Sequence, residues 1–150
     1  MTEEQRQSDL IAALLRDETT MTLATVDENG EPCIAPLYYI VDEDLTLYWL
    51  SSAKSQHSQN LRRSTSASAA VFQHTEYWKE ICGVQIRGRV EIIDDPAIRK
   101  PLVKAYCERF HLAGVLRLAI HRSTLCALRP QWFRYVDNSI RFGYKFELTR

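Results

Sequence analysis

The sequence predicts a mainly β protein of the α+β class, in which six or seven antiparallel strands form a barrel with a few short covering helices. Three observations predict it. Runs of β-prone residues are separated by short turns, the apolar stretches are strand-sized, and the helical patterns between them are brief and irregular. Consecutive antiparallel strands in a small domain tend to close into a barrel because closure removes exposed sheet edges.

The first half of the chain reads as one helix followed by a three-stranded meander. Thr2 and Gln5 have the spacing of a capping box, and apolar residues then recur on one face, so we expect a helix over 3–16. Strands are expected at 20–26, 32–41 and 45–50. Asn29-Gly30 lies between the first two strands and is a strong hairpin signal, because both residues tolerate positive φ.

The second half adds four more strands and three short helices. A polar helix is expected at 55–63, strands at 66–73 and 81–93, and a helix that starts at Asp95-Pro96. Pro101 must either kink that helix or mark its true start. A further helix around 112–118 and strands at 124–136 and 139–148 complete the pattern.

Length and composition fit one domain over residues 1–150, because 45% of the chain is hydrophobic and 25% is charged. No apolar stretch is long enough for a transmembrane helix. The acidic, polar start at Met1 does not resemble a secretory signal, so we expect a cytoplasmic protein whose four cysteines are reduced and mostly buried.

The charge pattern points to anions rather than to polymers. Net charge is zero, so we expect neither nucleic acid nor membrane as a partner. Two spans contain no carboxylate, 45–75 and 109–136. The second carries five arginines (Arg109, Arg117, Arg122, Arg129, Arg134). This distribution predicts one or two pockets for anions on a neutral protein.

Other chemistries find little support in the sequence. The histidines and cysteines are not clustered, so no metal site is expected. No serine lies in a recognisable nucleophile turn, and no Gly-x-Gly-x-x-Gly motif is present. No residue qualifies as a catalytic acid or base.

The segment that best predicts chemistry joins the strand at 45–50 to the polar helix at 55–63. Ser51 and Ser52 end the strand, and Lys54, Ser55, Gln56 and His57 open the helix. Hydroxyls, a cation and the free N–H groups of a helix start are what a phosphate group requires. The alternative is that the serines only end a strand and cap a helix, with Lys54 solvated.

The order of these parts resembles the FMN-binding split-barrel family typified by pyridoxamine 5′-phosphate oxidase, over nearly the whole chain. The resemblance is closest to a YhbP-like branch of that family. It is carried by residues 23–30 and 35–38 of the opening hairpin, the 51–57 turn, and the segments 83–88, 104–106, 109–110, 137–138 and 142–145.

The resemblance implies a split barrel that holds FMN and works as a homodimer with flavin sites at the subunit interface. It assigns Ser51, Ser52, Ser55, Gln56 and His57 to the FMN phosphate, and Pro36, Leu37, Tyr38, Gly83, Val84 and Gln85 to the flavin ring. Lys145 is a further candidate for contact with flavin or substrate, and an aromatic residue of the C-terminal hairpin is a candidate for the partner's flavin.

The sequence departs from the family where the phosphate turn needs charge. Gln56 and His57 stand where many members have Arg and Lys, and a neutral donor makes a weaker bond to phosphate than a cation does. The substrate-binding signature of true pyridoxamine phosphate oxidases has no match. We therefore expect an FMN-dependent oxidoreductase acting on a small molecule of unknown identity. The alternative is a non-catalytic module that binds flavin, haem or another anion.

Overall fold

The computed structural model describes residues 1–114 and 116–150 and confirms a mainly β, split-barrel-like fold. The helices are α1 (Glu3–Asp17), α2 (Gln56–Arg63), α3 (Pro96–Arg109) and α4 (Leu116–His121), with a short 3₁₀ helix, η1 (Trp78–Glu80). The strands are β1 (Thr20–Val26), β2 (Pro32–Tyr38), β3 (Ile40–Val41), β4 (Leu47–Ser51), β5 (Ser66–Phe72), β6 (Cys82–Ile92), β7 (Thr124–Asp137) and β8 (Lys145–Thr149).

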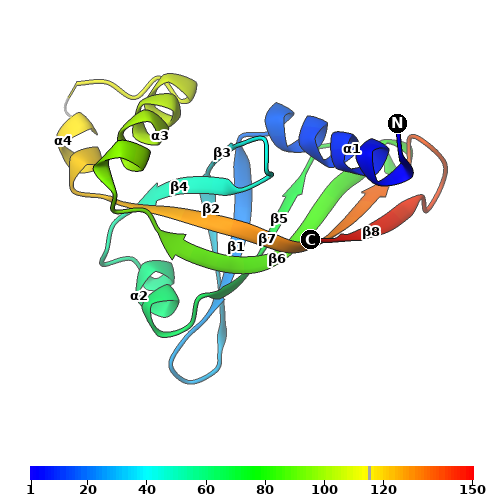
Figure 1. The fold of residues 1–150 in the computed structure, drawn as a ribbon. Coiled ribbons are helices and arrows are strands. Elements are labelled where there is room, and N and C mark those ends of the chain that lie inside the picture. Colours follow the sequence, from blue (N-terminus) through cyan, green and yellow to red (C-terminus); the bar gives the residue numbers. More distant parts are fainter. Residues whose placement is uncertain (115) are drawn as a thin grey trace.

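All of these strands belong to one curled antiparallel sheet with the order β2-β1-β5-β6-β7-β4-β3 (Figure 1). The two ends of this path, β2 and β3, are consecutive in the chain and are separated only by Tyr39. The chain itself therefore joins one end of the sheet to the other. β8 pairs with the second half of the long strand β7, whose first half pairs with β4.

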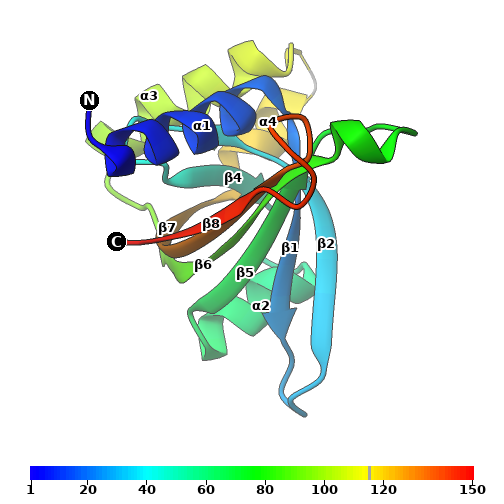
Figure 2. The same cartoon turned by 90° about the vertical axis from the view of Figure 1, so that its right-hand side faces the viewer.

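The core lies on the inner face of this sheet. Side chains alternate along β5 and β6, so that Ala69, Val71, Val84 and Ile86 are buried while their neighbours face outward. α1, α3 and α4 lie at the upper end of the curled sheet and α2 at the lower end (Figures 1 and 2). α2 also packs on the inner face, because its Leu61 is part of the core and its Asn60 donates to the buried Thr25 of β1. The inner and outer faces of the sheet are therefore chemically distinct, and the outer face is available to ligands and partners.

α1 is attached to the sheet at the junction between β2 and β3. The fully buried Tyr39 donates its hydroxyl to the carbonyl of Leu15 at 2.7 Å, near the C-terminal end of the helix. Helix ends leave carbonyls without intrahelical donors, and this hydroxyl satisfies one of them. Thr2 caps the other end as expected, because its side chain accepts from the N–H of Gln5.

Three of the expected strands differ from the structure, each for a local reason. The strand predicted at 32–41 is divided, because the buried Tyr39 turns the chain inward. The strand predicted from residue 45 begins at Leu47, because Leu45 has a φ of 63° and the Asp42 carboxylate binds the N–H groups of Asp44 and Thr46. The strand predicted from residue 139 begins at Lys145, after a loop closed by hydrogen bonds to the side chains of Asp137 and Asn138. The helix expected around 112–118 is described over Leu116–His121, and residue 115 of the expected range lies outside the described residues.

α3 begins where the sequence predicts and contains its proline. Asp95 caps the helix by accepting from the N–H of Ala97, and Pro96 occupies the first turn. Pro101 lies inside the helix rather than at its start. Among the described residues, no helix has both the length and the apolarity needed to cross a membrane.

Candidate functional site

The turn between β4 and α2 brings three of the predicted phosphate residues together. The buried Ser51 ends β4, and its Oγ shares a hydrogen bond of 2.7 Å with Nε2 of His57. The same nitrogen lies 3.1 Å from Oγ of Ser55, the N-cap of α2. The two hydroxyls and the imidazole therefore form one cluster at the start of this helix.

The other two predicted phosphate residues support the turn in a different way. Ser52 is exposed, and its Oγ accepts from the N–H of Lys54 at 3.2 Å. Gln56 donates its side-chain amide to Asn60 at 2.8 Å, along the helix. Asn60 is buried and in turn donates to Thr25 of β1 at 3.0 Å, so this chain of amides fixes α2 to the sheet.

The electrostatics of the turn favour a neutral imidazole beside free backbone donors. Burial lowers the pKa of His57, so the ring is uncharged at neutral pH. The N–H groups of Gln56 and His57 occupy the first turn of α2, where no intrahelical acceptor exists. Arg62 donates to the carbonyl of Ala53 at 2.5 Å and Lys54 is exposed, so the nearby cations contact the backbone or solvent.

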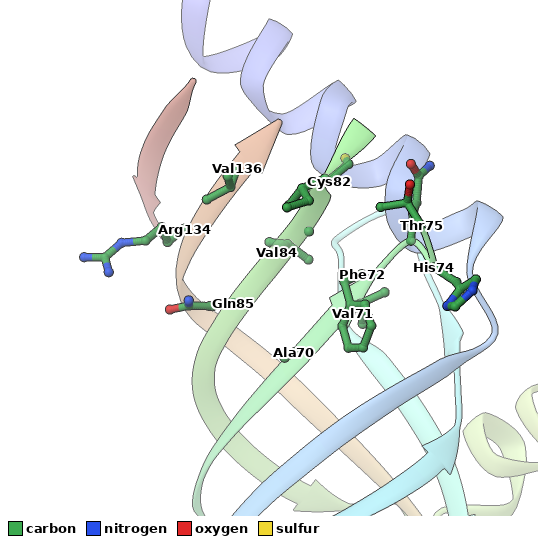
Figure 3. Close-up of a pocket in the computed structure, with 13 residues that line it drawn as sticks. Ala70, Val71, Phe72, His74, Thr75, Cys82, Val84, Gln85, Arg134 and Val136 are labelled. Carbon is green, nitrogen blue, oxygen red and sulfur yellow. The ribbon is translucent and has the colours of Figure 1, made fainter. Parts of the chain in front are cut away.

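A pocket of about 420 Å³ lies on the outer face of the sheet, over β5, β6 and β7 (Figure 3). It contains two of the predicted ring residues, Gly83 and Gln85, and it is bordered by Val84, whose side chain is buried on the inner face. The other lining residues are Ala70, Val71, Phe72, Gln73, His74, Thr75, Ile81, Cys82, Arg134 and Val136. Of the described residues, none of the five turn residues lines this pocket.

Gly83 keeps the floor of the pocket open. A Cβ at this position would lie only 3.0 Å from Cβ of Phe72, which is directly opposite in the strand register. Ala70 lies opposite Gln85 in the same register. The floor is therefore built from small side chains, with the amide of Gln85 as a polar group beside them.

The strand register extends this outer face as far as β2. Gln85 pairs with Ala70, Ala70 with Thr22, and Thr22 with Pro36, so these positions form one row across the sheet. Pro36 is exposed at the end of that row. The register therefore relates Pro36 and Gln85, two predicted ring residues that are far apart in the sequence.

The remaining ring candidates on β2 point elsewhere. Leu37 packs against the core on the inner face. Tyr38 stacks on Phe110 with ring centroids 4.4 Å apart, and its carbonyl accepts from the hydroxyl of Tyr106. Lys145 is exposed on β8, opposite Val136 at the pocket edge.

The arginine-rich span does not form a single anion site. Arg134 is the member that lines the pocket, and it binds Glu147 at 2.6 Å. Arg129 binds Glu91 at 2.7 Å, and Arg109 donates to the carbonyl of Arg16. The two acids in these contacts, Glu91 and Glu147, lie outside the span, so the run of acid-free sequence did not reveal them.

Sequence reasoning missed Phe72, His74 and Arg134 as pocket residues. The signal that could have identified Phe72 and Arg134 is the two-residue alternation of β5 and β7, which places both on the outer face with Gln85. His74 lies in the connection after β5, where no periodicity exists. Among the described residues, no group of three or more His, Cys, Asp or Glu side chains is arranged to hold a metal.

A second cavity, of about 330 Å³, separates α1 from the end of the sheet. Its buried polar group is Asp137, which accepts from the hydroxyl of Tyr135 at 3.0 Å and from Ser139. Burial alone would raise the pKa of this carboxyl, but these hydrogen bonds hold it below its usual value. Asp137 is thus a satisfied, ionised group that orders the loop after β7.

Comparison with known proteins identifies relatives over most of this chain. The family model described as Pyridoxamine 5′-phosphate oxidase matches residues 8–137. The YhbP protein of Salmonella choleraesuis (strain SC-B67) is 29% identical over 129 residues, which cover 83% of this chain and 82% of that protein. The expected resemblance to the YhbP-like branch is confirmed.

The same fold recurs among solved structures. The conserved hypothetical protein Rv2991 from Mycobacterium tuberculosis superposes with a TM-score of 0.77 at 22% identity, covering 93% of this chain and 86% of that one. A heme binding protein from Mycobacterium smegmatis gives a TM-score of 0.74 at 19% identity, covering 99% of this chain and 59% of that longer one.

Proposed function

Because the chain belongs to the pyridoxamine 5′-phosphate oxidase family, we propose that it binds FMN and acts as an FMN-dependent oxidoreductase on a small molecule. The observation that carries the proposal is the cluster of Ser51, Ser55 and His57 at the start of α2. It combines side-chain hydroxyls, an imidazole and free backbone N–H groups in one turn, the donor set that a phosphate ester uses.

The residues fit both ends of the cofactor. Among the described residues, the side chains that hydrogen-bond to Ser51, Ser55 or His57 include no carboxylate. None of them would therefore repel a phosphate. At the pocket, Gly83 and Ala70 give the flat floor that a planar ring requires, and Gln85 offers an amide to its polar edge.

The separation of turn and pocket supports a homodimer. The turn follows the last residue of β4, whereas the pocket lies on the outer face of β5, β6 and β7. If the outer face of one copy lies beside the turn of another copy, a single FMN can contact both sets of residues. An isologous dimer makes this exchange twice with one interface.

The flavin, when bound, supplies the hydride or electron transfer. The residues of this chain position the flavin. Ser51, Ser55 and the α2 N–H groups would hold the phosphate, and the His57 ring would keep both hydroxyls in place beside it. Phe72, Ile81 and Val136 line the pocket and exclude water from one side of the ring.

Haem is the second candidate, because His74 lines the same pocket beside apolar side chains. An imidazole is a common axial ligand of haem iron, and a structural neighbour is a heme binding protein. On this alternative the fold is a binding module without oxidoreductase activity. Arg134 would then face a haem carboxylate.

Absorbance of the purified protein separates these candidates. Flavin bands near roughly 450 nm support the first, whereas a Soret band that is lost in a His74→Ala variant supports the second. A colourless protein that binds neither FMN nor haem on titration contradicts both.

A further inference from the structure

An arginine stacked on a tryptophan stands on the outer face of the sheet, next to the pocket. Arg87 follows the lining residue Gln85 by two positions on β6, so both side chains leave the same face of the strand, about 7 Å apart. The guanidinium carbon of Arg87 lies 3.9 Å from the centroid of the Trp132 ring, and Trp132 is directly opposite in the register with β7. Arg87 is therefore the cation of β6 that lies nearest to the pocket.

The other charged groups around Trp132 are already paired. One oxygen of Glu147 accepts two hydrogen bonds from Arg134, at 2.6 and 3.0 Å, and the other lies 3.4 Å from the indole nitrogen of Trp132. The hydrogen bonds from Arg134 and Trp132 lower the pKa of Glu147, and the positive charge of Arg87 adds to that effect. Within the described part of the chain, the Arg87 side chain makes neither a hydrogen bond nor an ion pair. Its N–H donors are therefore available to a ligand.

Trp132 holds the guanidinium of Arg87 and leaves its edge free. A guanidinium that stacks on an aromatic ring has one face covered, whereas its N–H groups point outward in its own plane. The indole also removes water from the covered face, which strengthens a charge-assisted bond made at the edge. Two parallel N–H groups on such an edge match a planar acceptor with two oxygens.

The surface between Arg87 and the pocket is built from small side chains. Ser68 lies opposite Arg87 on β5, and Ala24 lies opposite Ser68 on β1. In the neighbouring row, Ala70 lies opposite Gln85 and lines the pocket. A flat molecule can therefore extend from the pocket to the guanidinium edge, and the half-buried hydroxyl of Ser68 is a further donor beside it.

We propose that Arg87 determines the specificity of this pocket, and that the substrate is a flat molecule with a carboxylate group. The guanidinium edge binds the carboxylate, and the flat part of the molecule lies over the pocket. This assignment of a substrate class rests on the proposed function, in which the flavin ring occupies the pocket floor beneath the substrate. A carboxylate is favoured over a phosphate, because a phosphate is usually enclosed by several donors, whereas this edge offers one planar pair.

Isothermal titration with cinnamate, a flat carboxylate, tests the proposal on the purified protein. Cinnamamide is the comparison ligand, because it has the same flat skeleton without the charge. The wild type should bind cinnamate at least about tenfold more tightly than cinnamamide, the effect of one charge-assisted hydrogen bond. Arg87→Gln should remove that preference.

Two further variants separate a specific contact from a general effect of charge. Arg89→Gln is the matched control, because Arg89 is also exposed on the outer face of β6 but lies one step further from the pocket. It should keep the wild-type preference for cinnamate. Trp132→Leu retains the charge of Arg87 but removes its support, and it should reduce the preference several-fold. Circular dichroism verifies that each variant is folded.

Four outcomes overturn the proposal. Two concern the ligands: equal affinity of the wild type for cinnamate and cinnamamide, or tighter binding of phenyl phosphate than of cinnamate. Two concern the variants: equal losses in Arg87→Gln and Arg89→Gln, or an Arg87→Gln variant that binds FMN more weakly but riboflavin unchanged. The last result would assign Arg87 to the phosphate of the cofactor.

The test also separates this proposal from the proposed function. A protein that prefers cinnamate through Arg87 but binds no FMN supports the carboxylate site and refutes the flavin. A protein that binds FMN but does not distinguish cinnamate from cinnamamide refutes the carboxylate site alone.

Discussion

At the scale of single residues, His57 decides the character of the phosphate turn. Its Nε2 is within hydrogen-bond distance of both Ser51 and Ser55, and a neutral imidazole nitrogen either donates to or accepts from a hydroxyl according to its tautomer, whereas lysine and arginine only donate. The turn therefore holds itself in shape before a ligand arrives. This preorganisation of the turn compensates in part for the absence of a permanently charged side chain at position 57.

His57→Ala should weaken FMN binding by about 1–3 kcal/mol, the usual effect of losing one such bond. Isothermal titration of the apoprotein with FMN measures it. His121→Ala is the control, because His121 is an exposed histidine at the end of α4 and should bind FMN as the wild type does. Equal affinity in both variants would place the phosphate elsewhere.

The stability of the protein should also depend on pH through His57. Burial lowers its pKa in the folded state, so the unfolded chain takes up a proton at higher pH than the folded one. The stabilisation from the neutral ring is therefore complete above the unfolded pKa, about 6.5, and is lost as the pH falls below it. Urea unfolding at about pH 8 and about pH 5 should show a smaller difference between wild type and His57→Gln at the lower pH. A difference that is independent of pH contradicts this assignment.

Residue types were easier to predict than side-chain directions. The hydroxyls and imidazole of the turn could be identified because they are adjacent in the sequence. The family resemblance assigns Leu37 and Val84 to the flavin ring, whereas both side chains face the core. Strand alternation fixes such directions, but only once the register and the inner face are known.

At the scale of elements, the pairing of β6 with β7 contains the main irregularity of the sheet. The register shifts between Arg87 and Gly88, and Gly88 lies against the backbone of Arg129. A Cβ at Gly88 would overlap the Arg129 carbonyl oxygen. The bulge thus requires glycine, and it bends the two longest strands toward barrel closure.

Gly88→Ala should lower the free energy of unfolding by about 1–3 kcal/mol, the usual cost of forcing an extra group into a packed site. Gly83→Ala is the comparison, because its Cβ would lie 3.0 Å from Cβ of Phe72 and 3.3 Å from the carbonyl oxygen of Val71, a milder overlap than the one at Gly88. Chemical denaturation of both variants measures the difference. A loss at Gly88 no larger than at Gly83 argues against the bulge as the reason for this glycine.

The strands themselves were predictable because period-two patterns and turn residues agree along most of the chain. The errors arose where a side chain caps the backbone. The carboxylates of Asp42 and Asp137 each bind N–H groups two residues ahead, which delays β4 and β8. The 3₁₀ helix η1 was also missed, since its three residues carry no periodic signal.

At the scale of the whole molecule, closure depends on the junction at Tyr39. This residue separates the two ends of the sheet path and fastens α1 by its hydroxyl. Tyr39→Phe should lower the free energy of unfolding by about 1–3 kcal/mol, because the carbonyl of Leu15 is left buried without a donor. Tyr77→Phe, at an exposed position in the connection between β5 and β6, should change the free energy of unfolding by less than about 0.5 kcal/mol. Similar values for the two variants would contradict a role for this hydroxyl in closure.

The sequence could not reveal that the predicted cofactor residues fall into two groups. Ser51, Ser55 and His57 meet in one turn, whereas Gly83 and Gln85 lie on an outer face related to Pro36 by strand register. The order of strands in space, β2-β1-β5-β6-β7-β4-β3, differs from their order in the chain. Long-range pairing of this kind cannot be derived from local patterns.

The central claim is that the turn at Ser51–His57 anchors the phosphate of a flavin. The most direct measurement compares the binding of FMN and riboflavin, which differ only in that phosphate, to the same apoprotein. The account predicts saturable FMN binding with flavin absorbance near roughly 450 nm. It predicts much weaker binding of riboflavin. Equal affinity for the two flavins, or binding of neither, would contradict it.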